Sequence, residues 1–173
     1  AQILAPADIP RFARLSLIPA MQPTNATSDM KWAEARLGSE RLAGAYAWRK
    51  FRKAGCEIAG GSDFPVESEN PFHGIYAAVT RQDAGELPEG GWRPEERLTR
   101  EEAFLAYTRW AAYAEFSESE KGVLRPGALA DIIVVDRDVF AVPARDLRET
   151  KVLHTLVGGV RIKRAPAPKP KGK

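Results

Sequence analysis

The chain has 173 residues, a formal net charge of +3, 28% charged and 44% apolar residues, which is ordinary for a globular protein. No apolar run approaches the roughly 18 residues that a membrane-spanning helix needs, and one cysteine, Cys56, excludes an internal disulfide. The chain opens at Ala1 without the shape of a signal peptide. We therefore expect a portion of a longer protein, with the cytoplasm as the default compartment.

The positive charge is concentrated at the C-terminal end of the chain. Its last stretch is rich in proline and has no aromatic residue, so we predict that residues 164–173 form a disordered basic tail. The basic residues at this end of the chain, over 163–173, are Lys163, Arg164, Lys169, Lys171 and Lys173. The remainder is slightly acidic, which argues against nucleic acid as a partner.

The first half of the chain alternates between apolar and helical patterns. After a short helix begun at Asp8 and Pro10, residues 15–22 are typical of a buried strand and residues 24–32 of a polar loop. Apolar residues at helical spacing predict a helix over 40–54 that stops at Gly55. A second strand over 57–62 would complete a parallel βαβ unit, with 15–22 and 57–62 as neighbours.

The second half begins with a long loop over 83–98. Thr99 and Glu102 form a capping-box pattern that predicts the start of a buried helix. A β-branched strand over 127–140 and a hairpin with Gly158-Gly159 at its turn follow. We assign residues 1–121 to one domain and residues 122–163 to a small domain of β-strands.

Asp63 is the leading candidate for chemistry. It follows an apolar strand in "GGSDFPV", and catalytic side chains of parallel α/β folds gather at the carboxyl ends of strands. A carboxylate there can bind a metal or act as a general base. The alternative is an aspartate that only caps a helix or turn.

Five blocks of the sequence form a recognisable series: "QPTNATSDM", "GAYAWRKFRKAG", "GSDFPVESENPFHGIYAAVTRQD", "LTREEAFLAYTRWAA" and "GVLRPGALADIIVVD". These blocks resemble, in the same order, those of the amidohydrolase superfamily, in particular the amidohydrolase 3 group. The resemblance implies an α/β fold, the C-terminal part of a (β/α)8 barrel plus strands of a small β-sandwich. It also implies hydrolysis of non-peptide or cyclic amide C–N bonds through a metal-activated water. One or two divalent metals, usually zinc, would serve as cofactor.

The resemblance assigns roles to individual residues. Asp63 is implied as a metal ligand and as the base that takes a proton from the attacking water. The polar segment that follows the first strand is expected to line the substrate site, although a solvated loop is the alternative. Its candidate residues are Thr24, Asn25, Thr27, Ser28 and Asp29.

Most of the family's metal ligands have no counterpart in this chain. The H-x-H pair of the first strand and the later histidine ligands are absent, and His73 and His154 do not have the spacing of a metal pair. We interpret both as ordinary histidines. Asp131 and Asp136, at the two ends of an apolar strand, are interpreted as structural.

Two functions from different classes remain open. The first is a C-terminal portion of a metal-dependent hydrolase of a small-molecule substrate, too short for a barrel of about 200 or more residues and inactive by itself because most metal ligands are missing. The second is a non-catalytic structural or partner-binding piece that completes a barrel with another chain. The partner in either case is the missing N-terminal half of the barrel; no membrane partner is expected, and a homo-oligomer is left open.

Overall fold

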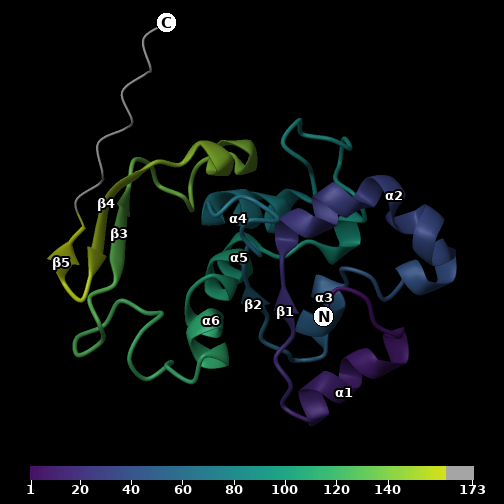
Figure 1. The fold of residues 1–173 in the computed structure, drawn as a ribbon, viewed down its shortest axis with the longest axis horizontal. Coiled ribbons are helices and arrows are strands. Elements are labelled where there is room, and N and C mark those ends of the chain that lie inside the picture. The colour runs from purple at the N-terminus through teal and green to yellow at the C-terminus, as the bar shows by residue number, and fades with distance from the viewer. Residues whose placement is uncertain (163–173) are drawn as a thin grey trace, which may run out of the picture.

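A computed structural model describes residues 1–162 (Figure 1). The expected disordered tail, 164–173, lies outside these residues. The helices are α1 Ile9–Arg14, α2 Pro23–Leu42, α3 Trp48–Lys53, α4 Pro71–Thr80, α5 Arg100–Ala106 and α6 Arg109–Ala114. Short 3-10 helices are η1 Pro6–Asp8, η2 Pro94–Glu96 and η3 Ala144–Glu149. The strands are β1 Ala20–Met21, β2 Ala59–Gly60, β3 Ile132–Val135, β4 Val152–Val157 and β5 Val160–Arg161.

The two short strands β1 and β2 form a parallel pair at the centre of the helical part (Figure 1). Ala20 pairs with Ala59, and Met21 with Gly60. The prediction that these two segments are adjacent and parallel is confirmed. Their carboxyl ends therefore open at the same edge, as in a barrel.

The connection between these strands differs from the prediction. Residues 24–32 are not a loop but the first half of α2, which starts with Pro23 in its first turn. Gly38, with φ 74°, interrupts α2. The single helix predicted over 40–54 is not continuous: the chain from Ala43 to Ala47 is not helical, and α3 forms only the later part of the predicted range. The stop at Gly55 is confirmed, because its φ is 91°.

The first predicted strand is also shorter than expected. Leu15 and Leu17 are 60% and 48% exposed, and only Ala20 and Met21 pair with β2. Asp8 does not cap α1 through its side chain, which instead forms an ion pair with Arg11.

The core lies between the parallel pair and the surrounding helices. Phe51 is fully buried and packs edge-to-face on Phe12, with ring centroids 5.1 Å apart. The fully buried guanidinium of Arg81 lies 4.1 Å from the Trp48 ring and 5.0 Å from the Trp92 ring. These contacts attach α3 and the end of α4 to the loop before η2. Cys56 is buried among these apolar residues, as predicted.

A second sheet, β3-β4-β5, lies apart from the parallel pair (Figure 1). The hairpin of β4 and β5 turns at Gly158-Gly159 as predicted, and the amide of Gly158 donates to Asp131. The strand predicted over 127–140 is paired only at β3. Asp136 accepts a hydrogen bond from the Lys151 amide and pairs with Arg137, which supports its structural interpretation.

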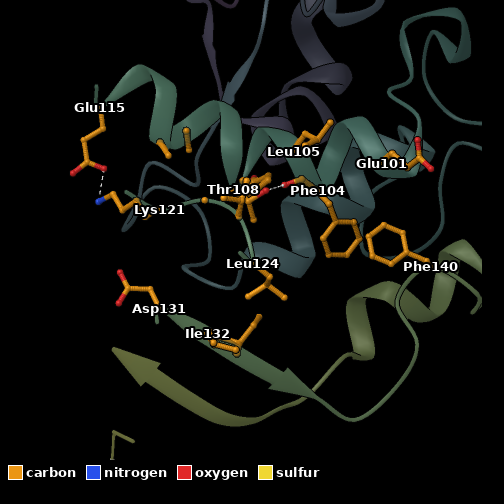
Figure 2. A pocket seen from close by; sticks show the side chains of 16 residues that line it. Glu101, Phe104, Leu105, Thr108, Glu115, Lys121, Leu124, Asp131, Ile132 and Phe140 are labelled. Atoms are coloured by element: carbon orange, nitrogen blue, oxygen red, sulfur yellow. Dashed lines mark hydrogen bonds and ion pairs between the residues drawn. The ribbon is translucent and has the colours of Figure 1, made fainter. Parts of the chain in front are cut away.

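A cavity of about 760 Å³ separates this sheet from α5 and α6 (Figure 2). Its lining is mainly apolar and includes Phe104, Leu124, Ile132 and Phe140, with an ion pair of Lys121 and Glu115 at one end. Asp63 and the residues that follow β1 are not among its walls. The division between residues 1–121 and 122–163 stays a prediction.

Among residues 1–162, no helix combines the length and the hydropathy that crossing a membrane would require.

Candidate functional site

The site is built at the edge where β1 and β2 end. The amide of Gly61 donates to the carbonyl of Met21 at 3.0 Å, which continues the parallel pairing one residue beyond β2. The chain then leaves the pair through Ser62 and reaches Asp63. On the neighbouring strand, Gln22 and Pro23 lead directly into α2. The end of one strand and the start of one helix therefore meet at this edge.

Asp63 is exposed and has a left-handed backbone, with φ 57°. Aspartate tolerates this region better than most residues, but such a conformation is uncommon and often marks a functional site. The carbonyl of Asp63 accepts a hydrogen bond from the Val66 amide at 2.8 Å, which closes a turn. The next helix, α4, is capped by the side chain of Asn70 and not by Asp63. Asp63 is therefore not the cap of the following helix.

The loop after Asp63 is joined to α2. The Ser28 hydroxyl donates to Glu67 at 2.6 Å, so the first turns of α2 and the segment that carries Asp63 are connected directly.

The five predicted substrate residues lie on two faces of α2. Thr24, Thr27 and Ser28 line a cavity of about 280 Å³ between α2 and α4. Asn25 and Asp29 are one turn apart on another face, where Asp29 accepts a hydrogen bond from the Tyr46 hydroxyl. Because these side chains point in two directions, they do not form a single set of contacts around Asp63. Their role in binding substrate stays a prediction.

Two polar atoms at the start of α2 are buried without a hydrogen-bond partner among the described residues. They are Oγ1 of Thr24 and Oδ1 of Asn25. Unpaired buried polar atoms are costly in native structures and call for a partner such as water or a ligand. Both atoms belong to residues that the sequence predicts to line the site.

The cavity beside Thr24 also contains one of the two histidines. His73, in the first turn of α4, shares its wall with Tyr76 and Arg148. Burial lowers the pKa of His73, and the nearby Arg148 acts in the same direction. His154 lies in β4, in the other sheet.

The described residues do not by themselves form a metal site. Within residues 1–162, no group of three His, Cys, Asp or Glu side chains could hold a metal ion. A catalytic zinc takes about three protein ligands. Asp63 can supply one carboxylate, and a three-ligand site needs at least one ligand from outside these residues.

Sequence reasoning missed one residue that contacts the site. Tyr107, between α5 and α6, donates from its hydroxyl to the Gly61 carbonyl at 3.1 Å. The sequence places this residue only within the buried helix predicted to start at Thr99. The sequence signal that could have indicated this contact is the pair of glycines, Gly60 and Gly74, because both glycines lie against the Tyr107 ring.

Comparison with known proteins agrees with this geometry. The model of the amidohydrolase family matches residues 1–162, and the chain belongs to this family. It is 33% identical over 159 residues to the amidohydrolase YtcJ of Bacillus subtilis, covering 92% of this chain and 30% of that protein. It is 34% identical over 112 residues to an N-substituted formamide deformylase of Arthrobacter pascens, covering 65% of this chain and 20% of that protein.

A solved structure shows the same fold. The chain resembles a metal-dependent hydrolase of Pyrococcus horikoshii with a TM-score of 0.73 and 28% identity, over 83% of this chain and 29% of that one. The predicted fold class is confirmed: an α/β structure that corresponds to part of an amidohydrolase barrel with a small sheet. The chain spans 20% to 30% of the length of these three relatives.

Proposed function

We propose that the full-length protein containing this chain is a metal-dependent hydrolase that cleaves a non-peptide C–N bond in a small molecule. The observation that carries the proposal is the position of Asp63. It is exposed at the carboxyl edge of a parallel strand pair, in a left-handed turn, and does not cap the following helix. This is where α/β barrels present catalytic side chains.

Asp63 would transfer protons during the reaction. Its carboxylate would accept a proton from the attacking water and return it to the leaving nitrogen, which is general base and then general acid catalysis. Such a role needs a carboxylate that is open to substrate while its backbone stays fixed. The hydrogen bonds at Gly61 and at the Asp63 carbonyl provide that fixed backbone.

The cofactor we propose is a divalent metal, with zinc as the metal that the family resemblance implies. When bound, such a metal supplies a water with a pKa lowered to about 7. Asp63 is the one residue of this chain that we assign to it, and the described residues do not complete a ligand set.

The substrate class rests on the relatives. One of them is named a deformylase of N-substituted formamides, so we propose amides, including cyclic amides, as the first substrates to test. Thr24 and Asn25 are the α2 residues that we propose as substrate contacts, because each has a buried oxygen without a partner among the described residues.

A metal-depletion experiment on the full-length protein tests this proposal. Purified protein would be treated with a chelator, and turnover of a panel of N-substituted formamides and cyclic amides would be measured before and after addition of zinc. We expect turnover to fall to background on depletion and to return with the metal. Turnover that survives complete depletion would contradict the metal-dependent mechanism.

A further inference from the structure

The ring of Tyr107 occupies a slot that only glycine leaves open. A Cβ atom at Gly74 would lie 1.8 Å from the Tyr107 hydroxyl oxygen, and one at Gly60 would lie 2.9 Å from the ring. Real Cβ atoms do not approach other heavy atoms this closely. One glycine belongs to β2 and the other to α4, so the strand before Asp63 and the helix after it both accommodate this ring.

The hydroxyl at the end of this ring meets the backbone two residues before Asp63. It donates to the Gly61 carbonyl at 3.1 Å, while the Gly61 amide donates to Met21 at 3.0 Å. Both polar groups of the Gly61 backbone are thus engaged, one by β1 and one by Tyr107. Burial raises the pKa of the Tyr107 phenol, which keeps the hydroxyl protonated as a donor.

From this geometry we infer that Tyr107 is a positioning residue for Asp63. Through its hydrogen bond to the Gly61 carbonyl, Tyr107 fixes the turn that orients the Asp63 carboxylate. The inference rests on the proposed function. The turn has a left-handed residue at Asp63 and lies between the hydrogen bonds at Gly61 and at the Asp63 carbonyl. Freeing the Gly61 carbonyl would let the peptide that leads to Asp63 rotate. A misplacement of about 1 Å can cost about 100-fold in rate.

The direct test is Tyr107→Phe in the full-length protein, which keeps the ring in its slot and removes only the donor. We expect kcat to fall by about tenfold or more with KM within about twofold, because the substrate still binds and only the reacting group is misplaced. Tyr113→Phe is the matched control. Tyr113 lies in α6, is half-buried, and its hydroxyl makes no hydrogen bond among the described residues. That variant should keep the wild-type kcat.

A second variant acts on the same contact from the other side. A Cβ at Gly74 would lie 1.8 Å from the Tyr107 hydroxyl oxygen and 2.7 Å from the ring carbon Cζ, so Gly74→Ala displaces the hydroxyl and should also lower kcat. Because both changes break the Tyr107–Gly61 hydrogen bond, one by removing the donor and one by displacing it, the double variant Gly74→Ala/Tyr107→Phe should lose much less than the product of the two single losses. Losses that multiply would contradict a shared mechanism.

The outcomes separate this inference from the proposed function. If Asp63→Asn abolishes turnover while Tyr107→Phe keeps kcat within about twofold, the inference fails and the function stands. If Tyr107→Phe lowers the melting temperature but the folded enzyme keeps its kcat, Tyr107 serves folding only and the inference also fails. A wild-type protein without metal-dependent turnover would instead contradict the proposed function.

Discussion

The carbonyl of Met21 accepts a hydrogen bond from the amide of Gly61 across 3.0 Å, at the point where the two parallel strands end. This bond sets the start of α2 and the turn of Asp63 side by side, although 37 residues separate the two strands in the chain. Because the carbonyl of Gly61 is also held, by Tyr107, the position of Asp63 depends on three segments that are distant in sequence.

A first prediction concerns the 173-residue chain by itself. With added zinc it should hydrolyse amides no faster than background, since residues 1–162 hold no group of three metal-binding side chains and catalytic zinc needs about three. The measurement is turnover by purified chain at increasing zinc. Robust zinc-dependent turnover that Asp63→Asn abolishes would show that the chain carries a sufficient site.

A second prediction concerns stability and pH at Glu102. Its side chain is 17% exposed, pairs with Arg49 and Arg52, and accepts from the Thr99 amide. Burial alone would raise the pKa of Glu102, but these hydrogen bonds outweigh burial and hold it below its ordinary value of 4.5. The stabilisation is therefore present above pH 4.5 and is lost as the pH falls through the folded pKa.

Glu102→Gln should accordingly lower the free energy of unfolding of the full-length protein by about 2 kcal/mol at pH 7. The deficit should shrink in acid, where the wild-type carboxyl is also neutral. Denaturant unfolding at both pH values measures it, and Glu101→Gln, exposed in the same helical turn, is the control. A deficit of equal size in acid would show that charge is not its cause.

A third prediction tests the core beneath the site. Phe51→Ala should cost about 3–5 kcal/mol of unfolding free energy, because a fully buried ring is removed from its contact with Phe12. Phe116→Ala, at a side chain that is 85% exposed, should change it by about 0.5 kcal/mol or less. Thermal unfolding of the two variants compares them. Similar losses would mean that Phe116 is covered in the full-length protein.

The sequence predicted those elements whose signals are local. The capping box of Thr99 and Glu102 forms as expected, with both of its hydrogen bonds, and the glycine pair of the hairpin lies at its turn. Each depends on residues only a few positions apart. The parallel pairing of β1 and β2 was also predicted, since a helical pattern separates two apolar segments.

Patterns that depend on distant packing were not predicted. Helix α2 has small buried residues, Ala26 and Ala33, and mostly polar neighbours, so its first half has no apolar periodicity to reveal it. The break after α2 is tertiary in origin. Gly44 lies against the Leu4 backbone, and Ala45 pairs with Ile3 from the start of the chain.

The candidate site was predicted in the same uneven way. Asp63 could be named from a strand, two glycines and a proline that adjoin it in sequence. The hydrogen bond between Tyr107 and Gly61 could not be predicted, because these two residues are 46 positions apart and meet only in the fold. The division of the five candidate substrate residues between two faces of α2 could not be predicted either, because the segment was interpreted as a loop and a loop has no helical faces.

The most direct test of the account is the steady-state kinetics of Asp63→Asn in the full-length protein. The amide keeps the shape of the carboxylate but cannot accept the proton of the attacking water, so we expect turnover to fall by about 100- to 10,000-fold or more. Asp63→Ala should abolish turnover as well, with the fold and most metal binding retained. Asp131→Asn, at a strand end in the other sheet, should leave turnover unchanged. If Asp63→Asn kept turnover within about threefold of wild type, far less than the loss of a general base, Asp63 would be a structural turn residue and the catalytic assignment would be wrong.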